Sequence, residues 1–231
     1  MINFYDEMPK DMLPVSYNPN KNDHLIDLPF RMCVCAPSGS GKTNYLLNLI
    51  HLFSKGKGTF SSITIITRVA DEPLYNYIKL KSESIQILEG LHKTPELNKF
   101  DKDENHLVVW DDLVLAKSLE MVENYYLRAR KFNVSCIFLS QSYYHIPTFI
   151  RKNSMYIVIL KLGSGKREVS CIMSDIGGRL EQETIMAMYD YATDTKFSPF
   201  IIDMGQTDLQ KKYRKGFNEF LNPAEYQLES S

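Results

Sequence analysis

Residues 31–43 read Arg-Met-Cys-Val-Cys-Ala-Pro-Ser-Gly-Ser-Gly-Lys-Thr, and this stretch decides the fold. Its first five residues form a short apolar run that suits a buried strand. A glycine-rich turn follows, and residues 43–54 then repeat apolar side chains at helical spacing. A strand, a glycine-rich turn ending in Lys-Thr and a helix together are typical of a P-loop, which binds the phosphates of a nucleotide. We therefore expect ATP as a ligand.

The residues of this loop have distinct expected tasks. Gly39 and Gly41 let the backbone turn its N–H groups inward around the phosphates. Lys42 reaches the β- and γ-phosphate oxygens, and the Thr43 hydroxyl is a ligand for Mg²⁺. Ala36 replaces the first glycine of the motif, which a small residue tolerates. The expected phosphate-binding residues are Ser38, Gly39, Ser40, Gly41, Lys42, Thr43 and Asn44.

Further strands are predicted along the rest of the chain. Apolar, β-branched runs occupy residues 62–67, 85–88, 106–110, 134–140, 156–162 and 200–204. A second helical pattern covers residues 115–130. Strands that are apolar throughout are covered on both faces, which indicates a parallel sheet with crossover helices. The predicted fold class is α/β: a P-loop NTPase three-layer sandwich with a mainly parallel central sheet, of the RecA-like, additional-strand type.

Two acidic residues follow one of these strands. His-Leu-Val-Val-Trp-Asp-Asp at residues 106–112 places Asp111 and Asp112 at its carboxyl end, where α/β folds bind their ligands. We expect Asp111 to hold Mg²⁺ through water and Asp112 to polarise the attacking water. Gln141 comes directly after the predicted strand 134–140. We expect it to lie at the same sheet edge and to sense the γ-phosphate.

Composition limits the classes of function. The 231 residues are 44% hydrophobic and 24% charged, with a net charge of −1, so a monomer that coats nucleic acid by charge alone is excluded. No apolar stretch approaches the ~20 residues of a membrane span, and we expect no membrane association. The four cysteines are predicted to be small core residues: Cys33, Cys35, Cys136 and Cys171.

The chain is predicted to have three parts. Residues 1–28 are rich in Asn, Asp, Pro and Lys without a clear period and form an N-terminal arm. Residues 29–205 form the ATPase core. Residues 206–231 form a C-terminal tail, in part an amphipathic helix, for which a nucleic-acid or subunit contact is the alternative.

These segments together resemble the FtsK/HerA superfamily of ring-forming ATPases, and within it the genome-packaging ATPases of large DNA viruses, virophages and polinton-type elements. The likeness lies in residues 35–44, in the pair Asp111-Asp112, in the block from Arg130 to Gln141 and in residues 146–153. It covers residues 28–205. The P-loop is generic, and the block from Arg130 to Gln141 is more discriminating.

The resemblance implies a motor that hydrolyses ATP to move double-stranded DNA into a preformed capsid. It implies a homo-oligomeric ring, a pentamer or hexamer, that contacts capsid vertex or portal proteins and acts in the host-cell cytoplasm, in a virus factory or in the virion. In that superfamily an arginine before the sensor strand reaches the neighbouring subunit's ATP site. Arg130 occupies the matching place, with Arg128 and Arg151 as alternatives. A near-neutral subunit suits such a ring, because phosphate contacts add around the pore.

Two other functions stay open at this point. A nucleotide or small-molecule kinase has the same phosphate loop, although no arginine-rich lid motif is evident in the sequence. An ATP-gated scaffold that binds capsid or DNA without pumping is the second alternative.

Overall fold

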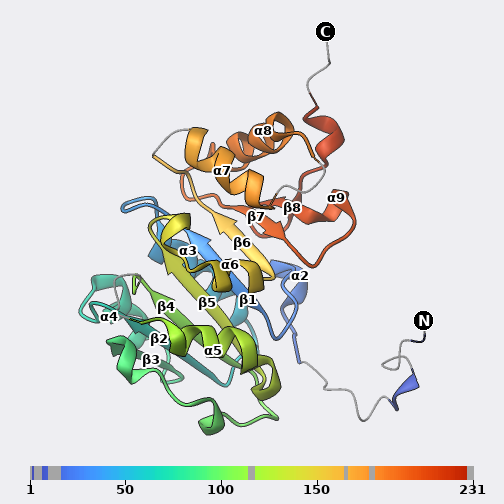
Figure 1. The fold of residues 1–231 in the computed structure, drawn as a ribbon. Helices are drawn as coiled ribbons and strands as arrows, with labels where there is room; N and C mark the ends of the chain where they lie inside the picture. The colour runs from blue at the N-terminus through green and yellow to red at the C-terminus, as the bar shows by residue number, and fades with distance from the viewer. Residues whose placement is uncertain are drawn as a thin grey trace.

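The computed structural model describes residue 2 and residues 7–9, 17–113, 118–163, 166–176 and 180–227, without the side chains of Lys166 and Arg167. Within these residues, nine strands form one sheet in the order β3-β2-β4-β5-β1-β6-β7-β8-β9 (Figure 1). The strands are β1 (Arg31–Cys35), β2 (Ser62–Thr67), β3 (Ile85–Glu89), β4 (His106–Asp111), β5 (Val134–Ser140), β6 (Tyr156–Ile159), β7 (Phe200–Asp203), β8 (Tyr213–Lys215) and β9 (Glu219–Phe220). The first six are parallel, and β7, β8 and β9 are each antiparallel to the strand before them.

Helices and turns connect these strands. The α-helices are α2 (Lys21–His24), α3 (Lys42–Phe53), α4 (Pro73–Lys79), α5 (Glu120–Arg128), α6 (Thr148–Asn153), α7 (Lys166–Ile176), α8 (Gln182–Ala192) and α9 (Leu209–Lys212). The 3₁₀ turns are η2 (Leu91–Lys93), η3 (Leu97–Lys99), η4 (Ala129–Phe132), η5 (Tyr143–His145) and η6 (Pro223–Glu225). The helix predicted over residues 115–130 begins at Glu120, and residues 114–117 lie outside the described part of the chain.

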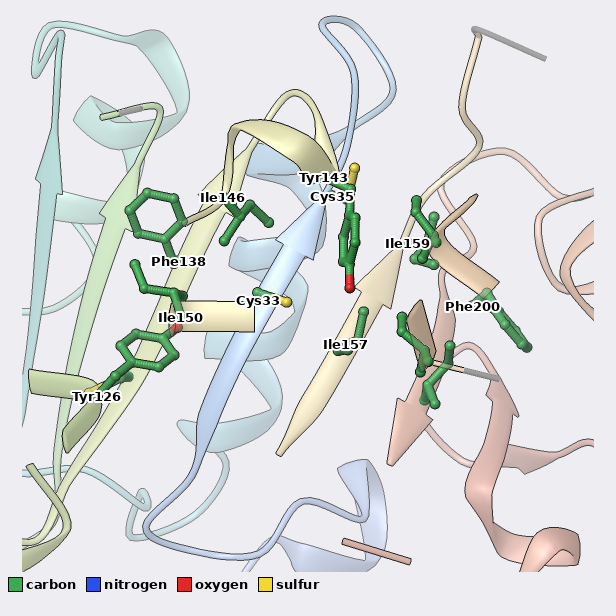
Figure 2. Packing of buried hydrophobic residues seen from close by; sticks show 14 of the residues in the cluster. Cys33, Cys35, Tyr126, Phe138, Tyr143, Ile146, Ile150, Ile157, Ile159 and Phe200 are labelled. Carbon is green, nitrogen blue, oxygen red and sulfur yellow. The ribbon is translucent and has the colours of Figure 1, made fainter. Parts of the chain in front are cut away.

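The helices cover both faces of the sheet, so the predicted three-layer α/β fold is confirmed. Alternate residues of β1 point to opposite sides: Met32 and Val34 pack with α3 and α4, whereas Cys33 and Cys35 pack with α5 to α8. Figure 2 shows the second of these cores, in which Cys33 lies among aromatic and aliphatic side chains from β5, β6 and α6. Cys171 is the exception among the cysteines, because it lies exposed on α7.

The C-terminal segment is helical in part, as predicted, and it also contains strands that were not predicted. Its helical parts are short, α9 (Leu209–Lys212) and the 3₁₀ turn η6, and β8 and β9 extend the sheet beyond β7. The reason is burial, since Tyr213 and Arg214 are each only 1% exposed and pair with β7. Strands β8 and β9 therefore belong to the sheet, and the boundaries at 28/29 and 205/206 stay predictions.

A buried arginine joins this segment to the N-terminal one. One guanidinium nitrogen of Arg214, Nη1, donates to the carbonyl oxygens of His24, Leu25 and Phe217, each at 3.1 Å. His24 and Ile26 are fully buried, so the end of the predicted arm packs into the core. Across the described residues, no helix combines the length and apolarity needed to cross a membrane.

Candidate nucleotide-binding site

The phosphate loop joins β1 to α3. After Cys35 the chain turns back on itself, and Ser40 donates through both its backbone N–H and its hydroxyl to the carbonyl of Pro37, at 3.1 and 2.7 Å. Gly39 and Gly41 have φ values of +75° and +96°, in the left-handed region that favours glycine. Helix α3 then begins at Lys42, so its unpaired N-terminal amide groups face the loop.

A cavity of about 720 Å³ lies beside this loop. Of the predicted phosphate-binding residues, those that line it are Ser38, Gly39, Gly41, Lys42, Thr43 and Asn44. Ser40 directs its hydroxyl to Pro37 instead. Asp111, Asp112 and Gln141 line the same cavity from the neighbouring strands. The structure therefore brings the loop, both carboxylates and the amide together at one edge of the sheet.

The two carboxylates share the charge of one lysine. The ammonium Nζ of Lys42 lies 3.1 Å from Oδ1 of Asp111 and 3.7 Å from Oδ1 of Asp112. Asp111 ends β4 and its side chain is 4% exposed, whereas Asp112 has a left-handed backbone, φ 56°, and a side chain that is 30% exposed. The turn at Asp112 directs the second carboxylate into the cavity, because successive residues of a regular strand would point to opposite faces.

Gln141 contacts Asp112 directly. Its amide Nε2 donates to Asp112 Oδ2 at 2.8 Å. This contact follows from the strand order, because β5 lies between β1 and β4, so the residue after β5 faces both the phosphate loop and the acidic pair. One strand thus lies between the loop strand β1 and the acidic strand β4, as the predicted additional-strand type of fold requires.

Tyr75 is a member of the site that sequence reasoning missed. This residue of α4 is fully buried, and its hydroxyl donates to Asp111 Oδ2 at 2.6 Å. Burial and the adjacent Asp111 carboxylate raise the pKa of Tyr75 far above its ordinary value, so the phenol stays a hydrogen-bond donor. An isolated tyrosine in a short helix carries no motif, so this contact depends on the tertiary structure.

Glu72 and Phe197 also line the cavity and were not predicted. Burial, together with the neighbouring Asp111 carboxylate, raises the pKa of Glu72. Phe197 comes from the loop before β7, so its sequence distance from the phosphate loop hides its proximity.

The acidic residues fit a magnesium ion. Oδ1 of Asp111 is buried and accepts no hydrogen bond, and the Lys42 ammonium is the positive charge beside it. Thr43, which carries a hydroxyl, lines the same cavity. Hydroxyl and carboxylate oxygens are the hard ligands that Mg²⁺ prefers. Thr43 and Asp111 are the residues that would hold the metal, and this role stays a prediction.

The three candidate arginines lie away from this cavity. Arg130 is exposed in η4, before β5, whereas Gln141 follows that strand. A strand of seven residues is about 20 Å long, so Arg130 lies at the opposite edge of the sheet. Arg128 is exposed beside a groove between α5 and η3.

Arg151 is held within its own subunit. Its guanidinium pairs with Asp175 at 2.7 Å and lies over the ring of Tyr143, 4.6 Å from the centroid. With 14% of its side chain exposed, Arg151 is less free to reach a neighbour than Arg130.

Comparison with known proteins finds one family and several relatives from poxviruses. The family described as "Poxvirus A32 protein" matches residues 19–204. The DNA packaging protein OPG160 of variola virus, and that of vaccinia virus (strain Copenhagen), are 30% identical over 146 residues, which cover 57% of this chain and 53% of each relative. The chain thus spans about half the length of the curated relatives it matches.

Solved structures share the fold at low sequence identity. The genome packaging NTPase B204 from Sulfolobus turreted icosahedral virus 2, in complex with sulfate, is 12% identical and covers 82% of this chain and 98% of its own, with a TM-score of 0.56. B204 is also known in complex with ATP-γS. The cytoplasmic domain of the Type VII secretion ATPase EccC from Thermomonospora curvata is 13% identical, with a TM-score of 0.52, and covers 78% of this chain and 24% of its own.

Proposed function

Because the chain belongs to the poxvirus A32 protein family, we propose that it is an ATPase that packages double-stranded viral DNA into a preformed capsid. One observation carries the proposal: Lys42, Asp111, Asp112 and Gln141 converge on a single cavity beside the phosphate loop. The names of the relatives, DNA packaging protein and genome packaging NTPase, support the process that this ATPase would serve.

The binding step follows from charge. Loop amides and the α3 N-terminus present positive dipoles to the phosphates. Lys42 lies between the two carboxylates, and its flexible stem lets the ammonium reach the β- and γ-phosphate oxygens. Mg²⁺, held by Thr43 and Asp111, would neutralise phosphate charge.

The hydrolytic step belongs to Asp112 and Gln141. Departure of the Lys42 ammonium leaves Asp112 as an acceptor for a proton of the attacking water. The amide of Gln141 holds the other oxygen of that carboxylate at 2.8 Å and so fixes its orientation. Gln141 thereby couples the γ-phosphate end of the site to the loop after β5.

In an assembled ring, a neighbouring subunit would supply a further positive charge to each ATP site. Arg130 is exposed at the edge opposite its own cavity, which supports a role in the ATP site of a neighbouring subunit. A ring of five or six copies would place such an arginine at every site. The chain's net charge of −1 is compatible with DNA contacts that are summed around a pore. Capsid vertex or portal proteins would be the docking partners, in the cytoplasm, a virus factory or the virion.

The test is ATP hydrolysis with and without double-stranded DNA. Wild type should hydrolyse ATP in the presence of Mg²⁺, faster with DNA, and EDTA should abolish the activity. Lys42→Ala should lose it, whereas Lys57→Ala, in an exposed loop, should not. Transfer of the γ-phosphate to a nucleoside monophosphate, without stimulation by DNA, would instead identify a kinase. Binding of DNA without ATP-driven movement along it would identify a scaffold.

A further inference from the structure

Phe197 projects over the phosphate loop from a distant part of the chain. A side-chain carbon placed on Gly41 would come within 2.3 Å of the Phe197 ring, so the edge of the ring rests on the glycine. Phe197 has a φ of 69°, which is a genuine outlier for a bulky residue and costs free energy. Phe197 is nevertheless 40% exposed, so burial in the core does not offset this cost.

The strand order fixes which end of a nucleotide lies near this ring. Asp111 ends β4 and Gln141 follows β5, and both strands lie on one side of the phosphate loop. The γ-phosphate must lie on that side, near Lys42 and the acidic pair. Phe197 lies in the loop before β7, and β7 is two positions from β1 on the other side of the sheet. A triphosphate that crosses the loop therefore directs its sugar and base towards Phe197.

We propose that Phe197 stacks on the base of the bound nucleoside triphosphate. The proposal deepens the ATPase function and rests on it. The ring contacts Gly41 through its Cδ1–Cε1 edge, and the Lys196 ammonium lies 4.9 Å from the ring centroid. The exposed remainder of the ring lines the cavity, where the face of a base can cover it.

This contact would recognise a class of ligand rather than one nucleotide. A phenyl ring has no hydrogen-bonding group, and every base has a π-face, so stacking tolerates different bases. Phe197 should therefore strengthen the binding of ATP and GTP to a similar extent. Phe197 should contribute nothing to the binding of a ligand that has phosphates but no base.

Inorganic tripolyphosphate separates base stacking from support of the loop. We would measure dissociation constants of ATP, GTP and tripolyphosphate by calorimetry with Mg²⁺, using the full chain. Phe197→Ala should weaken ATP and GTP about tenfold or more, as loss of aromatic stacking does, and change tripolyphosphate less than twofold. Phe197→Tyr keeps an aromatic ring, so this variant should bind ATP about as tightly as wild type. Phe149→Ala, an exposed aromatic of α6, is the matched control.

Other binding results would contradict base stacking by Phe197 or the ATPase function. Equal weakening of ATP and tripolyphosphate would assign Phe197 to support of the phosphate loop and overturn the proposal, as would unchanged binding of both. Wild type that binds tripolyphosphate as tightly as ATP would also overturn it, while leaving the phosphate site intact. Wild type that binds neither ligand would overturn the ATPase function itself.

Discussion

The hydroxyl of Tyr75 donates a 2.6 Å hydrogen bond to Oδ2 of Asp111, and both residues are buried. The bond occupies one carboxylate oxygen and leaves Oδ1 facing Lys42. It therefore fixes the orientation of the carboxylate that would hold Mg²⁺, and Tyr75 is a positioning residue.

Tyr75→Phe should raise the Mg²⁺ concentration needed for half-maximal ATP hydrolysis by about tenfold. The reason is that a buried carboxylate oxygen left without its donor costs about 1–3 kcal/mol. The measurement is a Mg²⁺ titration of the hydrolysis rate. Tyr77→Phe, on the exposed side of the same helix, is the control. Identical Mg²⁺ titrations for Tyr75→Phe and wild type would contradict the positioning role.

Gln141→Ala should lower kcat about 10- to 100-fold and leave the dissociation constant of ATP nearly unchanged. Without the amide, the partly exposed Asp112 carboxylate loses its fixed orientation, and aligned proton acceptors contribute about 10²–10⁴-fold to a rate. Single-turnover hydrolysis and equilibrium binding separate the two effects. Gln210→Ala on α9 is exposed and should resemble wild type. A variant that loses ATP affinity with kcat intact would place Gln141 in binding.

Arg130→Ala should abolish most hydrolysis even in a fully assembled ring, because arginine fingers contribute about 10³–10⁵-fold in GTPases. Mixing it with Lys42→Ala gives a sharper test. Some interfaces in the mixed rings combine an intact phosphate site with an intact Arg130 from the neighbour, so activity should return. Mixtures as inactive as the separate variants would argue against an arginine supplied by the neighbouring subunit. The same mixing experiment with Arg128→Ala and Arg151→Ala ranks the alternatives.

Stability should fall as the pH drops from about 6.5 to about 4, in part because of His24. Burial, with a contribution from the nearby Arg214 charge, lowers the pKa of His24 to about 4. Its Nδ1 accepts the backbone N–H of Ile26 at 3.0 Å, so the folded state requires the neutral ring. In this window the unfolded chain binds the proton more readily than the folded one, and stability therefore rises with pH.

Urea denaturation at several pH values tests the His24 contribution. His24→Asn retains an acceptor for the Ile26 amide but does not titrate. Compared with wild type, the variant should lose less stability between pH 6.5 and 4, by an amount on the order of 2–3 kcal/mol. Parallel pH profiles would exclude His24 as a source of the acid sensitivity.

Arg214→Ala should destabilise the fold by at least about 2 kcal/mol. Arg214 is 1% exposed, and its guanidinium donates to three backbone carbonyls of two distant segments. Hydrogen bonds to a charged group contribute about 1.5–3 kcal/mol each. The free energy of unfolding from urea titration is the measure. Lys211→Ala, on the exposed helix before β8, should change it by less than about 0.5 kcal/mol. A similarly small change for Arg214→Ala would show that other contacts hold the two segments together.

The predicted strands were close to those found because each combines an apolar run with a clear end. Ser62–Thr67 and Val134–Ser140 match the prediction residue for residue. The predicted strand over residues 156–162 ends at Ile159 instead, and the backbone N–H of Leu162 donates to the hydroxyl of Tyr189. That partner lies 27 residues away, and a local pattern does not contain it.

The resemblance to viral genome-packaging ATPases is confirmed at the level of the family. By itself, the sequence determined the α/β fold, the phosphate loop and the convergence of Asp111, Asp112 and Gln141, because neighbouring strand ends share one sheet edge. The roles of these residues stay predictions.

Only the tertiary structure decided the rest. Tyr75 under Asp111, Phe197 over Gly41, and Arg214 between the two ends of the described chain all join segments far apart in sequence. Each of these residues looks ordinary in its local context, and none carries a spacing that marks its partner. Their roles arise from burial and close approach, which exist only once the sheet has formed and its helices have packed against it.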